Sequence, residues 1–312
     1  MSMSSSPELM ILPAVARTAG ISVVAPASFA RKERIDAGAE RLRALGFVPR
    51  FMPNAQARGP LFFAGTPEQR VADLHAAFAD LETQMVMCLR GGYGSNHLLR
   101  HIDPEVMLAH PKPFFAYSDL TGLQLHLLDQ LGLPAFHGPM LAADFYLEDG
   151  VHLDSFYAAL EGASYSVGAE QGLRVVRAGY ARGTLYGGCL SILVALLGTP
   201  WEPRTEGKLL FIEDVGAKPY QIDRMLWQLQ MAGKLDGVTG IIFGEMLDCA
   251  SPGAEPDLLE KVIKSSLADF RGPITLGLRS GHVSRNNVTL TFGASAELVV
   301  AESAELKIAK RL

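Results

Sequence analysis

The stretch PFFAYSDLTGLQLHLLDQLG, residues 113–132, contains one complete strand-to-helix unit. Its apolar start, PFFAYS (113–118), predicts a buried strand, and the segment DLTGLQLHLLDQLG (119–132) predicts a helix that ends at Gly132. Ser118 stands at the junction, where a serine hydroxyl commonly caps a helix N-terminus. A serine at the mouth of a sheet also suits a nucleophile, so the local pattern leaves both roles of Ser118 open.

The same alternation runs through the whole first half of the chain. Three further apolar runs predict strands, and three amphipathic or polar segments between them predict helices. The strands are GISVVAPAS (20–28), FVPRFMP (47–53) and MVMCLR (85–90), and the helices are 34–46, 66–80 and 95–102. Thr66 as N-cap and Pro67 at the first helical position mark the start of the second of these helices. This order predicts a parallel sheet built from right-handed βαβ units.

The pattern changes after about residue 165. The segment LRVVRAGYARGTLYGG (173–188) predicts two paired strands around a glycine-containing turn. Further strands are predicted at 208–216 and 238–246, helices at 189–200, 220–233 and 257–270, and a strand-rich tail at 274–300. We therefore expect an N-terminal α/β domain at 1–165, a linker at 166–175, and a C-terminal α+β domain at 176–312 with a strand-rich, barrel-like sheet.

Composition narrows the functional class. The 312 residues are 48% hydrophobic and 20% charged, the balance of a soluble globular protein. The net charge of -5 and the absence of a basic block argue against nucleic-acid or anionic-membrane binding. Residues 1–18 form a polar, irregular start without a signal-peptide pattern, and no apolar run reaches the ~20 residues that span a bilayer. With three scattered cysteines, these features predict a cytoplasmic protein.

A glycine-rich loop, RGGYG (90–94), follows the strand predicted at 85–90. In open α/β sheets, ligands bind beyond the carboxyl ends of the strands, and glycines let the backbone approach them. The loop therefore suits an anion or oxyanion site, although a tight turn explains it equally well. It matches neither the dinucleotide fingerprint nor a P-loop.

A serine nucleophile needs a base and a group that orients the base. Of eight histidines, His137, near the end of a possible strand, and His282, in the polar loop RSGHVSRNN, are the best candidates. Glu213 and Asp214 end a buried strand, and alternation places them on opposite faces. Three other carboxylates, of Asp103, Asp119 and Glu245, also lie near strand ends, so spacing alone does not choose the acid.

Several longer motifs carry a resemblance to a known family. They are RGGYGSNHLL (90–99), FFAYSDLTGLQLHLL (114–128), FHGPM (136–140), LYGGCLSILVALLGTPWEP (185–203), LLFIEDVGAKPYQIDRML (209–226) and SGHVSRNNVTLTFG (280–293). In this order they resemble the LD-carboxypeptidases, serine peptidases of the muramoyl-tetrapeptide carboxypeptidase type that are related to microcin C self-immunity peptidases. The resemblance covers nearly the whole chain.

The resemblance implies a role for individual residues. It assigns Ser118 as nucleophile, Glu213 as the acid and His282 as the base, with the serine in one domain and its partners in the other. The oxyanion donors would be the N–H of Asp119 and an N–H of Gly91 or Gly92. Substrate contacts would come from Arg90, Tyr93 and Tyr117. The family often has asparagine at Cys189 and proline at Thr291, and neither departure touches the triad.

The implied fold is a Rossmann-like, class I glutamine-amidotransferase-like domain followed by the α+β domain. The implied reaction releases the terminal D-alanine of cytoplasmic murein tetrapeptides during peptidoglycan recycling, through an acyl-enzyme. The resemblance implies no metal or cofactor, and a homodimer. Two alternatives stay open: a microcin C-type peptidase that cleaves an aminoacyl- or peptidyl-nucleotide amide, and a non-catalytic module that holds an anion on the glycine loop.

Overall fold

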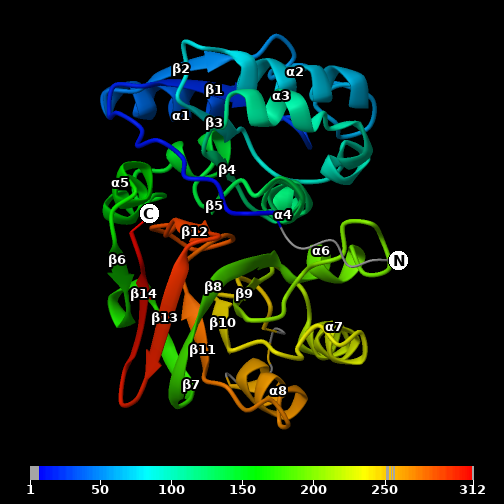
Figure 1. The fold of residues 1–312 in the computed structure, drawn as a ribbon, viewed down its shortest axis with the longest axis vertical. Coiled ribbons are helices and arrows are strands. Elements are labelled where there is room, and N and C mark those ends of the chain that lie inside the picture. Colours follow the sequence, from blue (N-terminus) through cyan, green and yellow to red (C-terminus); the bar gives the residue numbers. More distant parts are fainter. Residues whose placement is uncertain (1–6, 251–252, 254, 256, 311–312) are drawn as a thin grey trace.

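The computed structural model of the protein describes residues 7–250, 253, 255 and 257–310. These residues form two sheets, one above the other in Figure 1, with helices packed around each. The α/β class predicted from the sequence is confirmed.

The first sheet has the strand order β12-β5-β4-β3-β1-β2. Its strands are β1 (Gly20–Val24), β2 (Val48–Phe51), β3 (Met85–Cys88), β4 (Phe114–Ala116), β5 (Ala135–His137) and β12 (Leu290–Phe292). The first five are parallel, whereas β12 runs antiparallel to β5. Its α-helices are α1 (Lys32–Ala44), α2 (Pro67–Ala79), α3 (Pro104–Ala109), α4 (Thr121–Leu131) and α5 (Leu153–Glu161). Short turns of helix are η1 (Ser95–His97), η2 (Leu99–His101), η3 (Ser118–Leu120) and the π-helical η4 (Leu141–Phe145).

Local chemistry sets the ends of two of these helices as predicted. Thr66 Oγ1 accepts a hydrogen bond from Gln69 N, and the Gln69 side chain accepts one from Thr66 N, so α2 starts in a capping box with Pro67 in its first turn. Gly132, at φ +68°, ends α4 in the left-handed conformation that glycine adopts without strain.

The second sheet is mixed and has the order β6-β14-β13-β8-β9-β10-β11-β7. Its strands are β6 (Tyr165–Val167), β7 (Arg174–Arg177), β8 (Gly179–Cys189), β9 (Lys208–Glu213), β10 (Gly240–Gly244), β11 (Ile274–Leu278), β13 (Ser295–Val300) and β14 (Ala304–Ile308). The remaining helices are η5 (Ala169–Gln171), α6 (Leu190–Ala195), α7 (Pro219–Met231) and α8 (Leu258–Ser266). Strands β8 to β11 form a parallel core in which β8 pairs with β9, β9 with β10 and β10 with β11.

The prediction of a hairpin within residues 173–188 is wrong. Strand β7 pairs antiparallel with β11 at one edge of the second sheet, whereas β8 lies between β13 and β9. The turn residues are present, but each strand pairs with a strand far along the chain, and the inner position of β8 buries its residues 185–189. The domain boundaries at 165 and 176 stay a prediction, to which the structure adds that β6 and β7 are both paired within the second sheet.

Chain crossing ties the two sheets together. Strand β12 comes from the C-terminal part of the chain and completes the first sheet beside β5 (Figure 1). Of the polar start at 1–18, residues 1–6 lie outside the described part. The rest is irregular, yet Leu12 and Val15 are buried, and Met10 N and Val15 N donate to Gly132 O and Leu160 O. This segment therefore packs onto the first sheet's helices.

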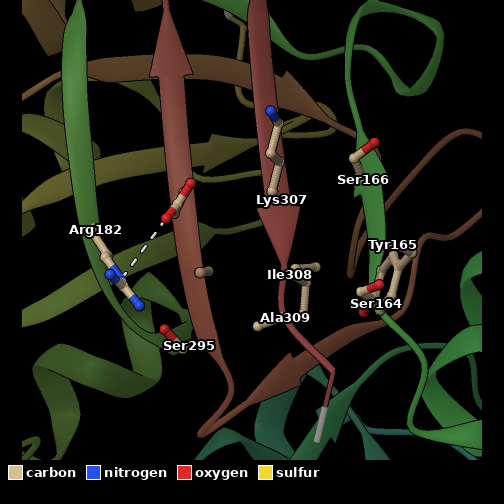
Figure 2. Close-up of a pocket in the computed structure, with 10 residues that line it drawn as sticks. Ser164, Tyr165, Ser166, Arg182, Ser295, Lys307, Ile308 and Ala309 are labelled. Atoms are coloured by element: carbon tan, nitrogen blue, oxygen red, sulfur yellow. Dashed lines mark ion pairs between the residues drawn. The ribbon is translucent and has the colours of Figure 1, made fainter.

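The open edge of the second sheet carries a polar surface pocket of about 400 Å³ beside β6, β13 and β14 (Figure 2). Arg182 and Glu297 form an ion pair of 3.8 Å in it, and Lys307 lies on the neighbouring strand. None of the candidate catalytic residues lines this pocket. Within the described ranges, no helix combines the length and the apolar character needed to cross a bilayer.

Candidate active site

Ser118 occupies a sharp turn between β4 and η3. Its φ of +67° is left-handed, a conformation that costs a non-glycine residue on the order of 1–3 kcal/mol. In the part of the chain that the structure describes, Ser118 Oγ forms no hydrogen bond, and the N-cap positions of η3 and α4 belong to Tyr117 and Leu120. The interpretation of Ser118 as an ordinary helix cap is therefore wrong. Its strained strand-to-helix turn exposes the hydroxyl in the way a nucleophile elbow does.

The glycine loop lies directly against this serine. A Cβ on Gly91 would stand 2.8 Å from Ser118 Cβ and 2.9 Å from Ser118 Oγ, so any larger residue there would have to displace the Ser118 side chain. Gly92, at φ +112°, faces the other way, since a Cβ on it would stand 2.4 Å from Ser28 Oγ. The loop is thus both a tight turn and a close backbone approach to Ser118.

Glu213 and His282 meet at the carboxyl edge of the second sheet. Glu213 is the last residue of β9, and His282 follows β11. Glu213 Oε2 accepts hydrogen bonds from His282 Nδ1 at 2.7 Å and from His282 N at 3.1 Å. The glutamate side chain is fully buried, whereas the histidine side chain is 19% exposed. The carboxylate therefore holds the imidazole through Nδ1, and Nε2 has no hydrogen-bond partner among the described residues.

Each partner shifts the pKa of the other. Burial by itself would raise the pKa of the Glu213 carboxyl, but the charge and hydrogen bonds of His282 outweigh burial and lower it. Burial by itself would lower the pKa of His282, but the Glu213 carboxylate outweighs it and raises this pKa above its ordinary value. The pair is built to stabilise an imidazolium.

The neighbouring carboxylate has a different task. Asp214 Oδ2 accepts from Ser191 N at 2.8 Å, and Asp214 Oδ1 accepts from Val215 N at 2.8 Å. Strand alternation at the end of β9 thus sends Glu213 toward His282 and Asp214 to cap the start of α6 and its own turn. The sequence left this choice open.

A buried polar network fixes the loop that carries His282. Asn287 Oδ1 accepts from Gly281 N at 3.0 Å, and Asn287 Nδ2 donates to Gly281 O at 3.1 Å and to Asp144 Oδ1 at 3.0 Å. Burial raises the pKa of Asp144 to about 6, against the opposing effect of its hydrogen bonds. Neither residue is predicted from the sequence: Asn287 lies in the polar loop around His282, whereas nothing in the local pattern around Asp144 marks it as functional.

Tyr117 belongs to this interior rather than to the solvent-facing surface. The side chain is buried, its hydroxyl donates weakly to Asp144 at 3.4 Å, and its ring packs edge-on against His282 with 5.2 Å between centroids. Burial, followed by the Asp144 charge, raises the pKa of the phenol. Tyr117 thus supports the His282 imidazole from beneath.

His137, the other candidate base, is fully buried at the end of β5. Burial lowers its pKa to about 4, so the ring is neutral near pH 7. A Cβ on Gly281 would stand 2.7 Å from His137 Nε2 and 2.8 Å from Glu213 Cδ, so these two atoms lie within 5.5 Å of each other. His137 therefore lies in the buried interior, close to the Glu213 carboxylate.

The other residues predicted to contact substrate or the oxyanion lie in and beside the glycine loop. Arg90 is exposed beside Gly91, and Tyr93 is 45% exposed in an aromatic cluster with Phe62 and Phe63. The Asp119 carboxylate accepts from Ser95 N at 2.8 Å, which ties η3 to the glycine loop.

The two sheets meet at their carboxyl edges around α4. Cys189 N donates to Thr121 Oγ1 at 3.1 Å, and a Cβ on Gly188 would stand 2.5 Å from Thr121 Cγ2. The Cys189 thiol lies 3.3 Å from Ser191 Oγ. Thr291, the other departure, lies in β12 and pairs with Phe136 of β5. This packing brings the Ser118 turn and the Glu213–His282 pair to one junction.

Family models match both halves of the chain. The model described as LD-carboxypeptidase N-terminal domain matches residues 21–138, and the LD-carboxypeptidase C-terminal domain matches residues 182–298. A protein of Bacillus subtilis (strain 168) named "Probable murein peptide carboxypeptidase" is 37% identical over 90% of this chain and 89% of its own length. The murein tetrapeptide carboxypeptidase of Pseudomonas aeruginosa is 32% identical over 85% of this chain and 89% of its own.

Solved structures share the fold. An MccF-like protein from Bacillus anthracis str. Ames superposes with a TM-score of 0.89 at 25% identity, over 96% of this chain and 99% of its own. A muramoyltetrapeptide carboxypeptidase from Oxalobacter formigenes superposes with a TM-score of 0.82 at 27% identity, over 93% and 99%. The microcin C7 self immunity protein MccF in complex with aspartyl sulfamoyl adenosine, at 22% identity and a TM-score of 0.86 over 96% and 98%, shares the fold.

Proposed function

Because the chain belongs to the LD-carboxypeptidase family, we propose that it releases the terminal D-alanine from murein tetrapeptides, with Ser118, His282 and Glu213 as its catalytic triad. The observation that carries the proposal is the left-handed turn of Ser118, which exposes its hydroxyl beside Gly91 without any capping role. The Glu213–His282 hydrogen bond supplies the matching base and acid.

The first step is acylation of Ser118. His282 Nε2 accepts the hydroxyl proton while Ser118 Oγ forms a bond to the amide carbonyl carbon, and Glu213 stabilises the imidazolium through Nδ1. The tetrahedral intermediate collapses as His282 protonates the departing amine of D-alanine. A water molecule, deprotonated by His282, then attacks the acyl-enzyme and releases the tripeptide. Ser118 Oγ forms no hydrogen bond with His282 within the described residues, and catalytic hydrogen bonds of this kind often tighten only in the complex with substrate.

We assign the oxyanion donors to Asp119 N and Gly92 N. Gly91 O accepts from Ser28 N, on the β1 side of β3. In a trans peptide the carbonyl and the next N–H point in opposite directions, so the Gly92 N–H is directed toward β4 and Ser118. Asp119 N starts the turn on which Ser118 lies, and a Cβ on Gly91 would be 3.4 Å from it. Losing one such donor costs about 2.7–4 kcal/mol in other enzymes.

The direct test is D-alanine release from L-Ala-γ-D-Glu-meso-diaminopimelate-D-Ala, combined with covalent labelling by a serine-reactive fluorophosphonate. We expect both in the wild type and neither in Ser118→Ala. Labelling that persists in Ser118→Ala would refute the assignment of Ser118 as the nucleophile. A protein that neither labels nor releases D-alanine is a binding module and not an enzyme.

One observation favours a second substrate class. Tyr93 and Phe62 are 45% and 44% exposed, with ring centroids 5.5 Å apart, beside the glycine loop. Such rings can stack on a nucleobase, as a microcin C-type peptidase that cleaves an aminoacyl-nucleotide amide requires. Turnover of an aspartyl-adenylate analogue without D-alanine release from the tetrapeptide would favour this function. We further propose a cytoplasmic, homodimeric enzyme of peptidoglycan recycling, which fractionation and light scattering test.

A further inference from the structure

A cavity with three arginines opens near the proposed nucleophile. It measures about 200 Å³ and is lined by Ala30, Arg31, Arg34, Arg90 and Ala142. No acidic side chain lines it. Nothing in the proposed chemistry at Ser118 requires this concentration of positive charge.

The sheet topology brings the three arginines to one edge. Arg31 and Arg34 belong to the N-cap and first turn of α1, which follows β1, and Arg90 follows β3. Strands β1, β3 and β4 are adjacent and parallel, so their carboxyl ends share the edge that carries Ser118. With strands about 4.8 Å apart, the axes of β1 and β4 are about 10 Å apart at this edge.

Arg90 connects the cavity to the active site. A Cβ on Gly92 would stand 3.6 Å from a terminal nitrogen of Arg90, so the guanidinium folds back over the glycine loop. Its positive charge also reaches Tyr117, whose pKa it lowers against the stronger effect of burial. The cavity and the oxyanion loop are therefore contiguous.

The three arginines of the cavity are solvent-exposed, and none of them has an ion pair within the described residues. The Arg34 guanidinium lies 4.5 Å from the Tyr146 ring centroid. The nearby Asp36 is paired with Lys32 at 2.8 Å. Guanidinium groups bind carboxylates through paired, charge-assisted hydrogen bonds, so a carboxylate is the ligand this cavity fits.

Resting on the proposed function, we propose that the three-arginine cavity binds the side-chain carboxylate of the third substrate residue, meso-diaminopimelate. That carboxyl carbon is six bonds from the scissile carbonyl carbon, an extended reach of about 7–8 Å. A hydrogen bond of about 2.8 Å extends this reach to about 10 Å, which is comparable with the spacing between β1 and β4 at this edge. The carboxylate of the terminal D-alanine is only three bonds from the scissile carbon and falls short.

The test compares tetrapeptides that differ in one carboxylate. Wild type, Arg34→Gln and the control Arg43→Gln, on the exposed surface of the same helix, are assayed with the diaminopimelate peptide, its L-lysine counterpart and a D-alanine amide form. We expect the wild type and the control to prefer diaminopimelate over lysine by about 10–100-fold in kcat/KM, the value of one charged hydrogen-bond pair. In Arg34→Gln this ratio falls toward one.

Equal losses on the diaminopimelate and lysine peptides would overturn the proposal. So would a penalty on the amide form in wild type that disappears in Arg34→Gln, because the cavity would then read the terminal carboxylate. Calorimetric binding of the intact peptides to Ser118→Ala, with and without Arg34→Gln, needs no turnover. Tighter calorimetric binding of the diaminopimelate peptide without D-alanine release supports the proposed role of the cavity and refutes the proposed function. D-alanine release without a preference for the diaminopimelate peptide supports the proposed function and refutes the proposed role of the cavity.

Discussion

Replacing Glu213 by glutamine isolates the charge of the proposed catalytic acid. Glu213 Oε2 accepts from both His282 N and His282 Nδ1. In Glu213→Gln the amide oxygen must take this place, because the amide NH₂ would face the His282 backbone N–H. The Nδ1–H tautomer is thereby retained, and only the negative charge is lost.

The lost charge sets the size of the effect. Two unit charges about 4 Å apart interact by about 4 kcal/mol at an effective dielectric constant of about 20. This interaction exists in the transition state, when His282 is an imidazolium, and is absent in the variant. We therefore expect kcat to fall by about 10³-fold, as measured by D-alanine release from the tetrapeptide. The far-ultraviolet circular dichroism spectrum should match that of the wild type.

The pH profile provides an independent readout of the same contact. His282 must be neutral to accept a proton, so kcat/KM of the wild type falls as the pH drops through a pKa above the ordinary 6.5. In Glu213→Gln, burial still lowers the pKa of His282, and only the smaller effects of the Asp214 and Asp144 charges oppose it, so the acidic limb moves to lower pH. A kcat within tenfold of wild type, or an acidic limb that does not move down, refutes the reasoning.

Asp214→Asn is the matched control. It alters the adjacent carboxylate, which caps Ser191 N and Val215 N, forms no hydrogen bond with the imidazole within the described residues, and raises the pKa of His282 less than Glu213 does. We expect a loss of about 1–3 kcal/mol in the free energy of unfolding, with kcat per folded molecule close to wild type. A collapse of kcat in this variant as deep as in Glu213→Gln would show that any nearby negative charge serves.

Three further substitutions test the packing around the site. Gly91→Ala places a Cβ 2.9 Å from Ser118 Oγ without positive-φ strain, so we expect a folded protein whose kcat and fluorophosphonate labelling both fall by at least tenfold, about 1.4 kcal/mol; unchanged labelling would contradict the close approach. Gly188→Ala combines φ +140° with an overlap at 2.5 Å from Thr121 Cγ2, so urea denaturation should show a loss of about 1–3 kcal/mol or more. Tyr117→Phe removes only a weak hydrogen bond and keeps the ring against the imidazole, so kcat should stay within about threefold; a larger loss would assign the hydroxyl a direct role.

The alternation of the first half was readable because each unit is local. A buried strand of a parallel sheet is an apolar run, and its helix has its own caps, as at Thr66 and Gly132. The second half was harder to read. Strands β7 and β8 are neighbours along the chain but lie far apart in the sheet, and β12 leaves the second half to complete the first sheet. No local pattern encodes such partners, because they are chosen by burial of whole faces.

In the candidate site, too, local features could be predicted from the sequence, whereas non-local contacts could not. The sequence by itself determined that Ser118 ends a strand, that glycines follow the strand before it, and that acids end another strand; with the motifs, it named the family. Only the tertiary structure decided that Glu213 rather than Asp214 faces His282, that Tyr117 is buried beneath the imidazole, and that Ser118 is left-handed instead of capping its helix. The physical reason is that local propensity sees a few residues, whereas the orientation of a carboxylate and the strain of a serine are imposed by two sheets that meet at their carboxyl edges.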